Sequence, residues 1–191
     1  MLLTIMERFM NKFYIFVTCA FLSCNVLADK QDDRQEVLDM RKEVLAKLYK
    51  EEPDVKDKIA DAKGYAVFSN IGINLVFFSA AGGNGVVHDN ASGKNTYMKM
   101  GSAGIGIGLG VKDFSAVFIF HTHDAMSDFI EHGWDFSGQA DVAAKSGKKG
   151  AEGSKAVTVV NGVSIYQMTE NGLALQATLQ GTRYWLDSDL N

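Results

Sequence analysis

The most constraining stretch of this sequence is the run G-S-A-G-I-G-I-G-L-G at Gly101–Gly110. Glycine stands at every second position from 104 to 110, and Ile105, Ile107 and Leu109 stand between the glycines. A period of two is the period of a β-strand, in which alternate side chains point to opposite faces. We therefore predict a strand over Ala103–Val111 with one apolar face and one bare face, where a sheet bends or another group approaches closely.

The same run could be mistaken for a dinucleotide-binding loop, but its spacing is wrong for one. The pattern Gly104-x-Gly106-x-x-Gly needs a glycine at 109, where the chain has Leu109. A dinucleotide fingerprint also lies at a turn from a strand to a helix. Here the next apolar segment, Val117–Phe120, is again strand-like. We therefore interpret the run as part of the fold and not as a nucleotide site.

The N-terminus has the features of a secretory signal peptide. Arg8 and Lys12 precede the apolar stretch Phe13–Leu22, which is too short to remain as a transmembrane helix. The sequence V-L-A, ending at Ala28, then supplies small or apolar residues before a cleavage point. We expect residues 1–28 to be removed and the remaining chain to be periplasmic or secreted.

Two questions stay open at this end of the chain. Translation starts at Met1 or at Met10, of which Met10 is the better candidate. Cys24, preceded by F-L-S, resembles a lipoprotein cleavage site and would leave the protein anchored by lipid. Cys19, the other cysteine, also lies in the removable segment, so simple cleavage leaves no thiol chemistry and no disulfide.

The charge balance restricts the partners. The whole chain has a formal net charge of −4, and residues 1–28 contain more basic than acidic groups, so their removal makes the charge more negative. An acidic chain of this kind argues against a nucleic-acid partner and has no general attraction to anionic membranes.

The rest of the chain predicts one domain over residues 29–191, with a helical segment over 31–62 and a β-rich body over 64–187. Gln31–Lys50 carries apolar residues three and four positions apart, as an amphipathic helix does. Asp54 is placed to cap a second, short helix that turns Val55 and Ile59 inward.

The β-rich body is predicted from short runs of aromatic and β-branched residues separated by glycine and asparagine. The expected strands are Tyr65–Phe68, Ile73–Ser79, Gly85–His88, Thr96–Met100, Ala103–Val111, Ser115–His121, Trp134–Ala140, Ala156–Val160, Gly162–Met168, Leu173–Leu179 and Thr182–Leu186. One helix, Thr122–Glu131, interrupts them, with Thr122 as N-cap and Gly133 just past its end. This pattern predicts an α+β fold that is mainly antiparallel β. We expect a curled, barrel-like sheet, with the N-terminal helices and the mid-chain helix packing on it and covering one side.

Catalytic and metal-binding patterns are weak. His121 and His123 are the only close histidine pair and are candidate metal ligands, but the pair lies at a strand-to-helix junction where the two side chains diverge. No cysteine and no evident third ligand completes a site. No serine lies in a nucleophile elbow, and the paired carboxylates fall on exposed helix ends. We expect a protein that is not an enzyme and has no cofactor.

A second candidate site is the basic, glycine-rich stretch K-S-G-K-K-G, with Lys145, Lys148 and Lys149. The stretch does not have the spacing of a phosphate-binding loop. It is either a solvated hairpin loop or a contact for a small anion or a lipid headgroup.

The chain resembles the SYLF domain family over about residues 62–186. The resemblance rests on motifs in a constant order: A-K-G-Y-A-V-F from Ala62, G-G-N-G-V-V from Gly82, G-S-A-G-I from Gly101, V-F-I-F from Val117 and L-Q-G-T from Leu179. The chain departs from the family at Gly106, where relatives often have glutamine, and at Gln180, where they often have glutamate.

The resemblance implies a non-enzymatic module. Eukaryotic members bind phosphoinositide-rich membranes, partly through an amphipathic N-terminal helix, and some bind actin. Actin binding is not expected for an exported protein, so the phospholipid or envelope surface is the partner that the resemblance favours. On this hypothesis the apolar residues of the helix Gln31–Lys50 would insert into the membrane. The headgroup contacts would come from Arg41, Lys42, Lys145, Lys148 and Lys149.

Two alternatives accompany this hypothesis. In the first, the helix Gln31–Lys50 would be a packing element whose apolar stripe covers the sheet. In the second, the protein would be a structural or protein-interaction module of the periplasm without affinity for lipid.

Overall fold

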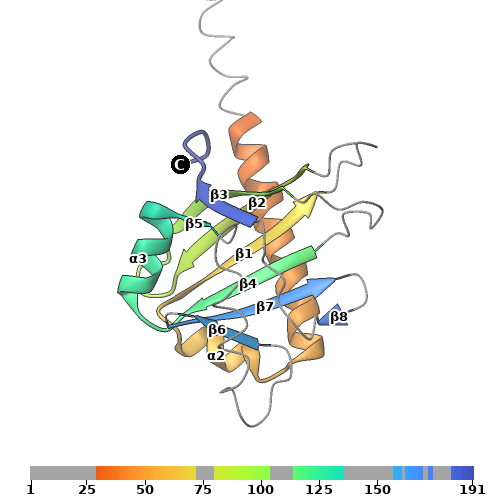
Figure 1. Cartoon of the computed structure of the whole chain (residues 1–191), viewed down its shortest axis with the longest axis vertical. Coiled ribbons are helices and arrows are strands. Elements are labelled where there is room, and N and C mark those ends of the chain that lie inside the picture. Colours follow the sequence, from red (N-terminus) through yellow and green to blue (C-terminus); the bar gives the residue numbers. More distant parts are fainter. Residues whose placement is uncertain are drawn as a thin grey trace, which may run out of the picture.

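A computed structural model describes residues 29–71, 80–103, 114–135, 157–160, 162–169, 172–173 and 182–191 (Figure 1). The N-terminal helix covers residues 29–51, as expected from Gln31–Lys50. The helices α2 and α3 cover Val55–Asp61 and His123–His132. The strands are β1 (Gly64–Ile71), β2 (Ala80–Asp89), β3 (Asn95–Ala103), β4 (Phe114–Phe120), β5 (Trp134–Asp135), β6 (Val157–Val160), β7 (Val163–Thr169), β8 (Gly172–Leu173) and β9 (Thr182–Leu186).

Several expected strands are only partly described. Ile73–Ser79 lies outside the described residues, and of the glycine-alternating strand Ala103–Val111 only Ala103 lies within them, at the end of β3. The described parts of Trp134–Ala140 and Leu173–Leu179 are Trp134–Asp135 and Leu173. The predicted strand Thr182–Leu186 is confirmed at both ends as β9.

The described strands form one sheet in the order β5-β9-β3-β2-β1-β4-β7-β6, with β8 paired to β7. Each of these pairings is antiparallel. The sheet curls into a half-barrel, so the prediction of an α+β fold with a curled, mainly antiparallel sheet is confirmed. The central pair β1 and β2 is aligned over eight residues, from Gly64 opposite Asp89 to Ile71 opposite Gly82.

The N-terminal helix and α2 cover one face of the sheet, here called the α2 face. Figure 1 shows the N-terminal helix passing behind the strands from the level of β9 down to α2. Its buried residues Val44, Leu45 and Leu48 pack with Tyr65 and Val67 of β1 and with apolar residues of β4 and β7. Nearer its start, Val37 packs on Val86 and Tyr97. The apolar stripe of this helix is thus a packing surface, and its proposed insertion into a membrane is wrong for this structure.

Helix α3 covers the opposite face, here called the α3 face. Its buried Met126 and Phe129 pack on Ala66 and Phe68 of β1 and on Phe118 of β4. The expectation that helices cover only one side of the sheet is therefore wrong. The reason lies in β1, where four consecutive residues, Tyr65–Phe68, are apolar or aromatic and alternate between the two faces, so both faces have to be covered.

Local signals fix the helix ends. Thr122 accepts a hydrogen bond from the backbone N–H of Ala125 and Gly133 follows α3 with φ of +67°, so both predicted caps of α3 are confirmed. Asp54 does precede α2, but its side chain makes no capping hydrogen bond because its backbone is already helical. The other end of α2 is held by Asn90, whose Nδ2 donates to the carbonyls of Ile59 and Ala62.

Candidate functional site

The predicted headgroup residues do not come together as a group among the described residues. Lys145, Lys148 and Lys149 lie outside the described residues. Lys42 is on the N-terminal helix and is exposed, with its Nζ 2.7 Å from Oδ1 of Asp39. Hydrogen bonds from Lys42 and Gln35 hold the pKa of Asp39 below its ordinary value. The charge of Lys42 is therefore already paired within its own helix.

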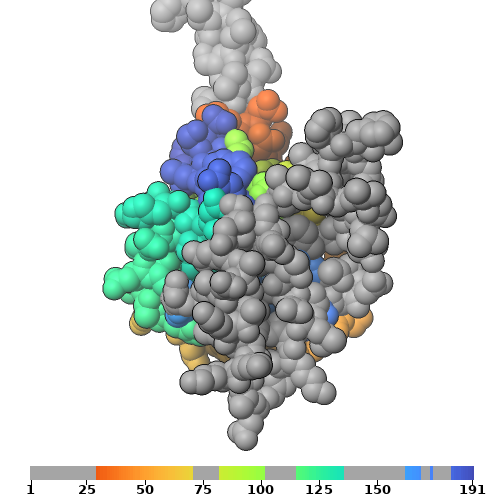
Figure 2. Space-filling view, viewed as in Figure 1, coloured from red at the N-terminus to blue at the C-terminus, as the bar shows by residue number. Residues whose placement is uncertain are grey.

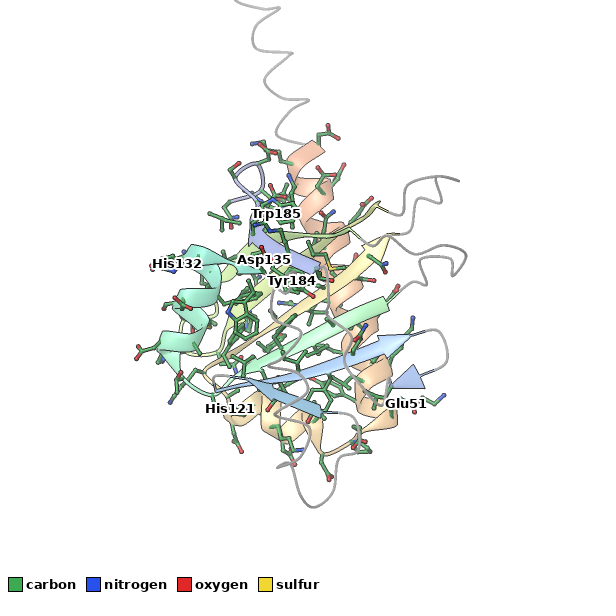
Figure 3. The ribbon with its side chains drawn as sticks, in the orientation of Figure 1. Glu51, His121, His132, Asp135, Tyr184 and Trp185 are labelled. Atoms are coloured by element: carbon green, nitrogen blue, oxygen red, sulfur yellow. The ribbon has the colours of Figure 1, made fainter. Side chains whose placement is uncertain are left out.

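The two histidines that were weak metal candidates diverge, as their place at a junction predicts. His121 places its Nε2 2.8 Å from Oγ of Ser164 in β7, whereas His123 is the first residue of α3. The described part of the chain contains no group of three side chains that could hold a metal ion. Figure 3 shows His121 at the lower end of the sheet, far from Trp185 and Tyr184.

Arg41, the remaining predicted headgroup residue, takes part in a polar cluster on the α2 face. Its Nη1 donates to Oδ1 of Asn95 at 3.0 Å, and the same oxygen lies 2.8 Å from Nδ1 of His88. Arginine can only donate, so the Asn95 atom that faces it is the oxygen, and His88 must also donate through Nδ1. The ring of His88 contacts the ring of Tyr65, with centroids 5.3 Å apart.

Two tyrosines adjoin this cluster. Burial raises the pKa of Tyr65, and the positive charge of Arg41 acts in the opposite direction. Burial also raises the pKa of Tyr49, and the charge that Tyr65 would carry when ionised raises it further. We call the group Arg41, Tyr49, Tyr65, His88 and Asn95 the Arg41 cluster. It contains several hydrogen-bond donors and no carboxylate.

A second surface feature lies at the end of β9. Trp185 and Leu186 are the large hydrophobic side chains that stay exposed among the described residues, at 45% and 44%. They are neighbours at the end of the strand, so their side chains point to opposite faces of the sheet. A Cβ added to Gly101 would lie 3.0 Å from the Trp185 ring, so glycine at this position leaves room for the indole to rest on the sheet.

Ion pairs surround Trp185. Lys99, its partner across the β3–β9 pairing, has its Nζ 3.1 Å from Oδ1 of Asp187 and 3.3 Å from Oδ2 of Asp189. The hydrogen bond to Asp187 raises the pKa of Lys99. Arg183, two residues before Trp185, has its Nε 2.7 Å from Oδ2 of Asp135. The exposed indole therefore lies among two positive and three negative charges, each of which takes part in an ion pair.

The residues after β9 keep this surface in place. Asn191 accepts a hydrogen bond from the backbone N–H of Tyr97 and donates to its carbonyl, which are the bonds that a neighbouring strand would make. Arg34 of the N-terminal helix donates from Nε to the carbonyl of Leu190 and lies over the Tyr97 ring. Figure 2 shows the C-terminal residues, in blue, at the surface beside α3.

Sequence reasoning missed both features for different reasons. The pattern R-Y-W at 183–185 places Trp185 on the same side of the strand as the charged residue Arg183, so alternation could have marked the indole as solvent-facing. The Arg41 cluster unites residues of the N-terminal helix, β1, β2 and β3, and the pairing of Tyr65 with His88 and of His88 with Asn95 depends on register. No spacing along the chain reveals it.

None of the helices in the described part of the chain has the length and apolar character needed to cross a bilayer. A family model described as Ysc84, Las17-binding protein actin regulator, matches residues 101–191. Beta cell expansion factor A of Aeromonas veronii is 36% identical over 146 residues, which are 76% of this chain and 54% of that protein. The chain thus spans about half the length of this curated relative.

The matched region begins within β3 and contains β4, α3 and the later described strands, so it includes Trp185, Leu186 and the part of the α3 face that β4, α3 and β9 supply. The Arg41 cluster lies before it. At the level of the family, these domains are associated with binding of lipid and of protein, including actin. On the match over residues 101–191, together with the similarity to Beta cell expansion factor A, the chain belongs to the Ysc84, or SYLF, family.

Proposed function

We propose that this protein is a non-enzymatic, exported lipid-binding domain that associates with membranes of the cell envelope. The observation that carries the proposal is the exposed side chain of Trp185 at the end of β9, beside which Leu186 is exposed on the other face of the strand. Tryptophan favours the interface between water and hydrocarbon, because its ring is apolar and its N–H is polar. The family association with lipid supports the same function.

This surface gives the membrane contact a different location from the one first expected. The apolar residues of the N-terminal helix are in the core, with Leu48 at 0% exposure, and are occupied in packing. Those residues would have to leave the core before they could enter a bilayer, whereas Trp185 and Leu186 are already exposed. Complete burial of a large apolar side chain contributes about 1.5–3 kcal/mol, and both are already half-buried, so we expect weak and reversible attachment.

Vesicle binding tests the proposal. The purified protein should co-sediment with vesicles of envelope phospholipids, and Trp185→Ala should reduce the bound fraction. Lys47→Ala, on an exposed position of the N-terminal helix, is the control. Absence of binding to every envelope lipid mixture would exclude the proposal.

The second candidate function is a periplasmic structural or protein-interaction module without lipid affinity. The observation that favours it is the same exposed Trp185, since tryptophan is also enriched at protein interfaces. Capture of a defined envelope protein by the wild type and not by Trp185→Ala, with no vesicle binding, would support it.

Export is part of both functions. The basic and apolar pattern of residues 1–28 supports a signal peptide cleaved after Ala28, with lipidation at Cys24 as the alternative. The mass and first residue of the protein isolated from the periplasm and from the membrane fraction distinguish the two. A protein that is found in the cytoplasm and still carries residues 1–28 would contradict both cleavage after Ala28 and lipidation at Cys24. For an exported protein we do not expect actin as the partner.

A further inference from the structure

The charge of Arg41 is not neutralised by any described residue. Positions three and four residues away on the helix are Val37, Leu38, Val44 and Leu45, so no ion pair forms along the helix. Across the interface the guanidinium meets the neutral amide of Asn95. Lys42, the next residue, shows the contrast, since Asp39 lies three positions before it and pairs with it.

An arginine charge without an ion-pair partner is unusual at the position that Arg41 occupies. Arg41 belongs to the N-terminal helix and is half-buried where this helix packs on the sheet. It lies next to Tyr65, whose pKa is raised by burial. Electrostatic interactions are stronger in such an environment than in water, and a buried charge normally has a partner. Nη1 is engaged by Asn95, and no acceptor among the described residues takes the other N–H groups of the guanidinium.

We propose that the Arg41 cluster is a binding site for a phosphate group, with Arg41 as its principal ligand. The planar guanidinium fork matches phosphate oxygens and can give two parallel hydrogen bonds. Asn95 and His88 position the fork, because both Arg41 and His88 donate to one amide oxygen. This inference rests on the proposed function, in which the phosphate belongs to a lipid headgroup; free phosphate is the other source of the same chemistry.

The Arg41 cluster lies on the same side of the sheet as Trp185 at the end of β9. Asn95, Tyr97 and Lys99 follow one another on the same face of β3, so the Arg41 cluster and Trp185 lie on one side of the sheet. At about 3.4 Å per residue, Asn95 and Lys99 are roughly 14 Å apart. A specific headgroup contact also suits a chain with a net charge of −4, which has no general attraction to anionic lipid.

Titration with inorganic phosphate, followed by NMR of the arginine Nε–H groups at constant ionic strength, tests the site. We expect a saturable shift of the Arg41 signal. Arg41→Met should weaken the response of neighbouring backbone amides by about tenfold or more. Arg41→Lys, which keeps the charge and loses the fork, should weaken it in part and covers the case in which Arg41→Met does not fold. Lys42→Met removes the same charge one residue away and should leave the response unchanged.

The outcomes separate a binding site from a structural tie. An unresponsive wild-type Arg41, or equal phosphate responses in Arg41→Met and Lys42→Met, would overturn the proposal. Loss of stability in Arg41→Met with an unchanged phosphate response would also overturn it, since Arg41 would then only fasten the helix.

Vesicles of phosphatidylcholine with and without phosphatidylglycerol separate this inference from the proposed function. Vesicle binding through Trp185 without any phosphate response would remove the phosphate site alone. A phosphate response without vesicle binding would remove the membrane function and leave a site for free phosphate. A response to both, with the phosphatidylglycerol effect lost in Arg41→Met, would support a lipid headgroup as the ligand.

Discussion

Neighbouring residues of this chain differ in role because their local partners differ. Arg41 and Lys42 have the same charge and adjacent positions, but one is half-buried against Asn95 and the other is exposed and paired with Asp39. Sequence reasoning grouped them as headgroup residues, since both are basic residues of an amphipathic helix. Only the rotation of the helix on the sheet separates them, and that depends on tertiary packing.

Glycine positions give a test of packing at the residue scale. A Cβ at Gly85 of β2 would overlap the ring of Phe68, whereas a Cβ at Gly82 of the same strand would meet nothing within 4 Å. Overpacking of a core costs about 1–3 kcal/mol. We expect Gly85→Ala to lower the free energy of unfolding by about that amount, measured by chemical denaturation.

The Gly82→Ala variant is the matched control, and its free energy of unfolding should stay within about 0.5 kcal/mol of the wild type. Equal effects of the two substitutions would contradict the placement of the Phe68 ring over Gly85.

At the scale of elements, the sequence predicted most of what local patterns control. The caps of α3, the ends of β9 and the inward residues Val55 and Ile59 of α2 follow from residue type and period, and the structure confirms them. Expected strands such as Gly85–His88 were shorter than β2 because glycine and asparagine resemble turn residues. Pairing within the sheet overrides that local preference.

The placement of the helices was less predictable. Both an interfacial helix and a packing helix have an apolar stripe, so the pattern of Gln31–Lys50 is typical of either. The structure decides between them because β1, β4 and β7 offer apolar residues that the helix covers.

Leu48 tests whether the N-terminal helix is a core element. Because its side chain is fully buried, Leu48→Ala should lower the free energy of unfolding by about 2–5 kcal/mol, measured by chemical denaturation. Lys47→Ala, next to it and exposed, should change stability little. A negligible effect of Leu48→Ala would show that the helix is not held on the sheet.

On the scale of the whole molecule, tyrosine burial sets an alkaline limit. Burial raises the pKa of Tyr184, and also that of Tyr65 and of Tyr49. Above about pH 10 tyrosines ionise in the unfolded chain, whereas the fully buried Tyr184 stays neutral in the folded one. The unfolded state then binds fewer protons, so stability falls as pH rises, by about 1.4 kcal/mol per pH unit for Tyr184, and Tyr65 and Tyr49 act in the same direction.

Tyr184→Phe removes one of these groups and should make the fall in stability above about pH 10 shallower, with no change in slope near pH 7. Denaturation midpoints across this pH range measure it. An unchanged alkaline slope would mean that Tyr184 ionises equally in both states.

The proposed membrane contact at the end of β9 can be tested through the fluorescence of Trp185. The protein has two tryptophans, Trp134 and Trp185, so Trp134→Phe leaves the indole of Trp185 as the only one. The most direct measurement is its fluorescence on addition of phospholipid vesicles with and without brominated acyl chains. We predict a blue shift of the Trp185 emission and quenching by the brominated lipid. An emission spectrum that no envelope lipid mixture changes or quenches would contradict the account.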